Sequence, residues 1–89
     1  MQKTGKQLER YFKGVSNHRR IDILLTIAVH EGITVSSISE FLRCNLKTLS
    51  EHTRRLVQAG LIEKRYQGLK VAHYLTETGK VFLRFLKSF

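Results

Sequence analysis

The chain has 89 residues, the length of one small domain. Its 16 Lys and Arg against 7 Asp and Glu give a net charge of +9, which favours a polyanionic partner: duplex DNA, RNA or an anionic membrane surface. A single cysteine, Cys44, excludes an intrachain disulfide and fits a reducing compartment. No apolar run approaches the roughly 20 residues of a membrane span, and the start lacks a secretory signal, so we expect a cytoplasmic protein.

Two helices are predicted in the first third of the chain. Apolar residues recur at helical spacing over about residues 2–13, and basic residues fill the other side of that helix. The stretch 17–30 is apolar on most of its circumference, which is typical of a central helix. We therefore expect 17–30 to form the core, with 2–13 lying on it or on a second copy of the chain.

The middle of the chain predicts a helix-turn-helix. Thr34 can cap a short helix at 35–42, and Asn45 can cap a longer helix at 46–59. Gly60 can take the left-handed conformation that ends such a helix. Only three residues join the two helices, and a turn this tight is typical of a helix-turn-helix.

After the second of these helices the periodicity changes from helical to alternating. Residues 61–75 contain two runs rich in apolar, branched and aromatic side chains, and Gln67-Gly68 separates them. This stretch is predicted to be a β-hairpin. Thr76 can then cap a last helix at 77–88.

The helix at 46–59 carries many hydrogen-bond donors on the face away from its apolar residues, which suggests insertion into a DNA major groove. Phosphate contacts would supply affinity and base-edge contacts would supply sequence choice. The alternative is an ordinary solvated helix face. The candidate DNA-binding residues of this unit, including one in the turn, are Arg43, Lys47, Thr48, Ser50, Glu51, His52, Arg54 and Arg55.

The tip of the predicted hairpin is also basic. Its candidate DNA-binding residues are Lys64, Arg65, Gln67 and Lys70, which are suited to a minor groove or its flanking phosphates. The alternative is a charged turn that keeps an edge strand from pairing with other chains.

Several short motifs resemble those of ArsR-like winged helix-turn-helix transcriptional regulators. The run TLSEH at 48–52 resembles the T-V-S-x-H core of their recognition helices. The run QAGLI at 58–62 resembles the E-A-G-L-V that leads into their wing. The run LTETG at 75–79 resembles the L-T-x-x-G that opens the last helix in ArsR-like and MarR-like regulators. The run RRIDIL at 19–24 resembles the R-x-x-I-L pattern in their second helix. Together these motifs extend the resemblance over roughly residues 17–80.

The resemblance implies a mainly α fold with a small β-hairpin (α+β), a winged helix-turn-helix of order α-α-α-α-β-β-α, over a single DNA-binding domain at 1–89. It also implies a sequence-specific regulator of transcription that binds double-stranded DNA, a dimeric repressor with helix 46–59 in the major groove and the 64–70 wing at the minor groove. The alternatives are a non-specific architectural DNA-binding protein, or a winged helix used for protein or RNA contacts.

The two ends of the chain carry more apolar surface than the rest of so small a domain can cover. We expect these ends to form a two-fold homodimer, as the resemblance also implies. The predicted interface residues are Leu8, Tyr11, Phe12, Val81, Phe82, Phe85 and Phe89.

Catalysis and metal binding have little support in the sequence. Cys44 or Ser50 with His52 lacks an orienting acid and an oxyanion loop, so we do not expect an enzyme. The metal-sensing ArsR-like members carry Cys-x-Cys or paired ligands in the last helix, and this chain has neither. We expect no metal and no cofactor. Cys44 is interpreted as a small buried hydrophobe; a redox sensor would need an exposed thiolate beside a cation.

Overall fold

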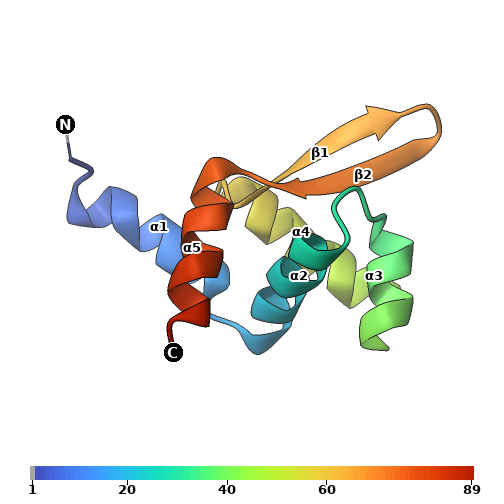
Figure 1. The fold of residues 1–89 in the computed structure, drawn as a ribbon, viewed down its shortest axis with the longest axis horizontal. Coiled ribbons are helices and arrows are strands. Elements are labelled where there is room, and N and C mark those ends of the chain that lie inside the picture. Colours follow the sequence, from blue (N-terminus) through green and yellow to red (C-terminus); the bar gives the residue numbers. More distant parts are fainter. Residues whose placement is uncertain (1) are drawn as a thin grey trace.

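The computed structural model describes residues 2–89 (Figure 1). Over this range the elements follow the predicted order of a winged helix. They are α1 (Gly5–Val15), α2 (His18–Val29), α3 (Val35–Leu42), α4 (Leu46–Gln58), β1 (Ile62–Gln67), β2 (Lys70–Leu75) and α5 (Glu77–Lys87). The predicted fold class is therefore confirmed. Nowhere in residues 2–89 is a helix long and apolar enough to cross a membrane.

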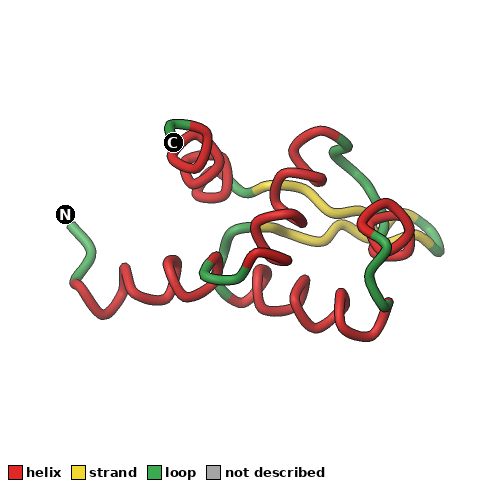
Figure 2. The backbone as a smooth tube through the Cα atoms, turned by 90° about the horizontal axis from the view of Figure 1, so that it is seen from below, coloured by secondary structure: helices red, strands yellow, loops and turns green. Residues whose placement is uncertain are grey.

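The core is built around α2, as its all-round apolar pattern predicts. Ile23, Leu24 and Ile27 are completely buried, and α1, α3, α4, α5 and β2 all pack against this helix. Figure 2 shows α1 and α4 along one side of the molecule and α5 on the opposite side, with α2 between them. This arrangement leaves the outer face of α4 without cover from the rest of the chain.

The first helix does not have the predicted bounds of about 2–13. Thr4 caps it: the Gln7 amide donates to the Thr4 hydroxyl at 3.2 Å, and the Thr4 amide donates to the Gln7 side chain at 2.9 Å. This reciprocal pair places the helix start at Gly5. The helix continues through Gly14, which lies buried against Ala59, the C-cap residue of α4; a larger residue at position 14 would clash there.

The turn between α3 and α4 contains no glycine, and Arg43 adopts the left-handed conformation instead, at φ 53° and ψ 44°. It is the only non-glycine residue with positive φ in residues 2–89. Two side chains close the turn. The Ser39 hydroxyl donates to the Cys44 carbonyl at 2.6 Å, and the Asn45 side chain accepts from the Lys47 amide at 2.9 Å and caps α4.

The hairpin is tied to the body of the protein through β2. His73 is 2% exposed, and its Nδ1–H donates to the Ile33 carbonyl at 2.9 Å. The backbones of these two residues also form an isolated antiparallel bridge. Burial lowers the pKa of His73 and so favours the neutral ring, while the hydrogen bond to the Ile33 carbonyl raises the pKa and partly offsets this effect. The wing therefore leaves the body at a defined angle.

Gly79 provides a test of the packing of α5 against the backbone at Leu61. A Cβ at this position would collide with the Leu61 carbonyl oxygen, which is backbone and cannot swing aside. We expect Gly79→Ala to lower the free energy of unfolding by ~1–3 kcal/mol in urea denaturation, although alanine is the better helix former. Gly5→Ala is the control, because nothing lies within 4 Å of a Cβ there. Equal stability of the two variants would contradict this packing.

Candidate nucleic-acid interface

The outward face of α4 is defined by the residues that anchor it. Leu49 and Leu56 are fully buried, and Thr53 is 2% exposed. The Thr53 hydroxyl donates to the Leu49 carbonyl at 2.8 Å, so this buried polar group is satisfied within the helix. Residues spaced by three or four positions share one face of a helix, so these three anchors turn the opposite face to solvent.

The structure places most of the predicted α4 candidates on that outward face. Lys47, Thr48, Ser50, Glu51, Arg54 and Arg55 are all exposed. Lys47 and Arg54 are seven residues apart and lie on one stripe, with Ser50 and Glu51 between them. We call Lys47, Ser50, Glu51 and Arg54 the outward stripe. Arg43 is exposed in the turn before α4.

Glu51, in this stripe, forms ion pairs with two arginines of α4. Its carboxylate accepts from Arg54 Nε at 3.0 Å and from a second nitrogen of the same guanidinium, and it lies 3.6 Å from Arg55 Nε. The hydrogen bond from Arg54 lowers the pKa of Glu51. These are exposed ion pairs and contribute little to stability. Their effect is to orient the guanidinium groups.

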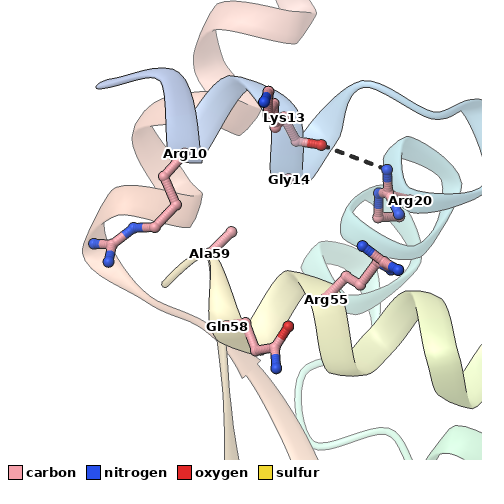
Figure 3. Close-up of a pocket in the computed structure, with 7 residues that line it drawn as sticks. All are labelled: Arg10, Lys13, Gly14, Arg20, Arg55, Gln58 and Ala59. Carbon is pink, nitrogen blue, oxygen red and sulfur yellow. Dashed lines mark hydrogen bonds between the residues drawn. The ribbon is translucent and has the colours of Figure 1, made fainter. Parts of the chain in front are cut away.

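His52 differs from the other candidates on α4. It is half-buried and faces α2, where its Nδ1 lies 3.5 Å from Arg20 Nη1. Arg20 also donates to the Lys13 carbonyl at 3.4 Å (Figure 3). Burial lowers the pKa of His52, and the charges of Arg20, Arg19 and Arg55 lower it further. Both effects favour the neutral ring, which lies beside the outward stripe.

The wing candidates divide between the two faces of the hairpin, because side chains alternate along a strand. Lys64 lies on the face that turns toward α4. With Tyr66 from β1 and Ser50 from α4, it lines a cleft of about 160 Å³ between the wing and the helix. Tyr66 is 77% exposed and was not among the sequence candidates. Its place two residues after Lys64 is the signal that could have found it.

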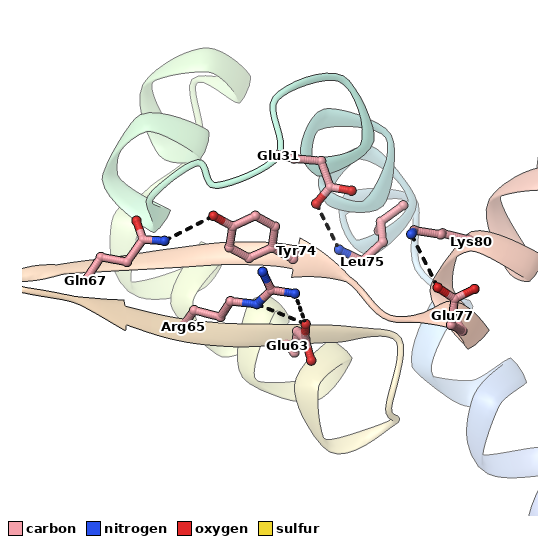
Figure 4. Close-up of polar contacts among 8 residues, drawn as sticks. All are labelled: Glu31, Glu63, Arg65, Gln67, Tyr74, Leu75, Glu77 and Lys80. Carbon is pink, nitrogen blue, oxygen red and sulfur yellow. Dashed lines mark hydrogen bonds and ion pairs between the residues drawn. The ribbon is translucent and has the colours of Figure 1, made fainter.

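Arg65 and Gln67 lie on the other face (Figure 4). Arg65 donates to Glu63 at 2.7 Å, and its guanidinium lies 4.1 Å from the centre of the Tyr74 ring. Gln67 donates to the Tyr74 hydroxyl at 3.2 Å. Lys70 pairs with Gln67 at the hairpin tip and is exposed. The four wing candidates therefore do not form one cluster.

The predicted interface residues at the two ends also divide into two groups. Tyr11 and Phe82 are each 9% exposed and belong to the core of the chain itself. The remaining five, Leu8, Phe12, Val81, Phe85 and Phe89, are exposed. Phe12 packs edge-on against Phe82 with ring centres 5.2 Å apart. Beside them is an apolar hollow of about 270 Å³ between α1 and α5.

The part of the chain that the structure describes contains no cluster of three or more His, Cys, Asp or Glu residues that could hold a metal ion. Cys44 is half-buried in the turn before α4, with its backbone carbonyl engaged by Ser39.

Comparisons with known proteins agree with the winged helix fold. The model of the MarR family matches residues 17–67. A homodimeric winged helix-turn-helix domain from Mycobacterium bovis, Mb0332, a possible ArsR-family regulator, is 29% identical with a TM-score of 0.81, covering 93% of this chain and 76% of that one. HlyU from Vibrio cholerae is 25% identical with a TM-score of 0.83, covering 97% and 94%. No curated protein matches the chain.

The environment of His52 can be measured by NMR titration. We expect its pKa to lie below the ordinary 6.5, and Arg20→Met to raise it by removing the nearest cation. Because the folded state disfavours the charged ring, the free energy of unfolding should fall as the pH drops from above 6.5 through the folded-state pKa. His52→Gln should weaken that dependence. A His52 pKa at or above 6.5 in the wild type would contradict its placement beside Arg20.

Proposed function

The chain belongs to the MarR family of winged helix transcription regulators, and from this premise we propose that it is a sequence-specific repressor that binds double-stranded DNA as a homodimer. One observation carries the proposal: α4 holds its outward stripe clear of the core on a capped, anchored helix. A helix of this kind fits the major groove of B-DNA, which is about 12 Å wide.

The side chains of α4 suit two kinds of contact. Lys47 and Arg54 can each approach guanine N7 and O6, and the Thr48 methyl can contact a thymine methyl. Arg55 and Arg43, at the edge of the stripe, suit phosphates. Glu51 would hold Arg54 in place until a base or phosphate replaces it as the partner.

The wing is proposed to lie at the minor groove or its flanking phosphates. Lys64 faces α4 across the cleft, so a DNA strand that passes between helix and wing would meet it. Lys70 at the tip can reach farther along the duplex. Arg65 and Gln67 lie on the opposite face of the hairpin and would approach DNA from that side. To contact DNA, Arg65 must release Glu63 and bind a phosphate in its place.

The homodimer is proposed to form through α1 and α5. Their exposed apolar residues surround a hollow whose lining is apolar throughout, and such a surface is costly to leave in water. The Mb0332 domain, 29% identical, is homodimeric. A two-fold dimer would place its two copies of α4 about one DNA turn apart, roughly 34 Å, and repress by occupying a pseudo-palindromic site.

Selection of preferred sites from a random DNA pool tests the function directly. We expect a two-fold motif, bound more tightly than random duplex by about 4 kcal/mol or more at physiological salt. Equal affinity for all duplexes would indicate a non-specific architectural protein instead. Absence of duplex binding would leave protein or RNA contacts as the function.

Arg54→Met tests the role of the outward stripe. If Arg54 reads a guanine, the variant should lose about 1–3 kcal/mol of affinity for the selected site and relax its preference at that base pair. Arg84→Met, on α5 at the far side of the molecule, is the control with the same charge change. Fluorescence anisotropy with labelled duplexes measures both. Equal losses in the two variants would contradict base reading by Arg54.

Phe85→Lys tests the dimer. A charge in the apolar hollow between α1 and α5 should convert the protein to a monomer, as measured by light scattering at micromolar concentration. Val29→Lys, at another exposed apolar position (75% exposed) at the end of α2, should leave the dimer intact. A monomeric wild type, or a dimeric Phe85→Lys variant, would refute this interface.

A further inference from the structure

A second basic site lies beside α4, at its C-terminal half. Helices α1, α2 and α4 enclose a cleft of about 260 Å³ lined by Arg10, Lys13, Arg20 and Arg55 (Figure 3). Gly14 and Ala59 leave room for it, because their side chains are small. None of the described residues that line the cleft is acidic.

Arg20 is the residue whose hydrogen bonding is incomplete. Its Nε is buried and has no partner among the described residues. Its other contacts, at 3.4 Å to the Lys13 carbonyl and 3.5 Å to His52, are longer than ordinary hydrogen bonds of 2.7–3.2 Å. Arg20 is half-buried with its Nε shielded from water, so the absence of an anion beside this guanidinium costs free energy. Arg20 therefore lacks a negatively charged partner among residues 2–89.

The acidic residues near the cleft do not supply this partner. Glu9 lies 3.4 Å from Lys13, and Glu51 lies 3.6 Å from Arg55, but both are surface pairs with well-exposed side chains. Such pairs exchange readily with water and salt. The lowered pKa of His52, to which Arg20 and Arg55 contribute after burial, is consistent with a positive potential at this position.

We propose that the cleft binds a phosphate oxyanion, held by the guanidinium of Arg20 and flanked by Arg55 and Lys13. The planar fork of an arginine matches two phosphate oxygens, and a partly buried site strengthens both hydrogen bonds. Arg10, whose head group points away from Arg20 in Figure 3, would add charge at the far end of the cleft.

Two sources present this chemistry: a backbone phosphate of bound DNA, or free phosphate. The first rests on the proposed function. It is supported by Arg55, which lines the cleft and lies 3.6 Å from Glu51 of the outward stripe. The helices α1 and α4 lie along the same side of the molecule (Figure 2). A phosphate held there would extend the DNA contact from α4 onto the first two helices, beyond the helix-turn-helix and the wing.

The first arm of the test is the salt dependence of DNA affinity. Arg20→Met and Lys13→Met should each lower the slope of log affinity against log salt by about 1, because one phosphate contact is lost. Lys87→Met, which removes the same charge from α5, should leave the slope unchanged. Thermal melting verifies that each variant folds, and Arg20→Lys, which keeps the charge, should retain most of the wild-type slope.

The second arm uses inorganic phosphate alone. Adding sodium phosphate should shift the Arg20 Nε–H and neighbouring amide signals in NMR spectra of the wild type, relative to sodium chloride at equal ionic strength. The Lys13→Met variant should show a smaller shift. A shift without a slope change identifies free phosphate as the source, and a slope change without a shift identifies DNA.

An unchanged slope in both variants together with no phosphate shift would overturn the proposal. If the wild type binds no duplex at all, the proposed function fails on its own. The NMR experiment with sodium phosphate then tests anion binding in the cleft by itself, so the two failures are distinguishable.

Discussion

The packing of α4 on α2 is the contact on which the rest of the molecule depends. Leu49 and Leu56 are buried completely against a core whose centre is Ile23 and Ile27. Burial of this face contributes the hydrophobic stabilisation and also sets the rotation of α4 about its own axis. The outward stripe has the composition of a binding surface, but it is available because the opposite face is anchored.

The wing is positioned by a different means, since a two-stranded hairpin has little stability of its own. The buried His73 ring and the backbone bridge to Ile33 join β2 to the segment between α2 and α3. Lys64 and Tyr66 thereby face α4, while Arg65 is held on the other side by Glu63 and Tyr74. The two parts of the candidate interface are thus fixed to the same core.

The charge of the chain is unevenly distributed over its surface. On α4, Glu51 pairs with Arg54 and Arg55, and on the wing Glu63 pairs with Arg65; a phosphate could replace either carboxylate. In the cleft between α1, α2 and α4, Lys13 and Arg55 pair with Glu9 and Glu51 at the surface, but no acidic residue among those described pairs with Arg20. The net charge of +9 is therefore partly compensated at the exposed sites and least compensated around the half-buried Arg20.

The sequence by itself determined the element order, the helix caps at Thr34, Asn45 and Thr76, and the basic outward face of the helix after the turn. These features are encoded within a few residues, by the 3.6 and 2.0 periodicities and by side chains that bond to nearby amides. Only the tertiary structure decided that His52 faces Arg20 and that Tyr11 and Phe82 are buried within the chain. Those outcomes depend on contacts between residues far apart in the sequence, which no local pattern records.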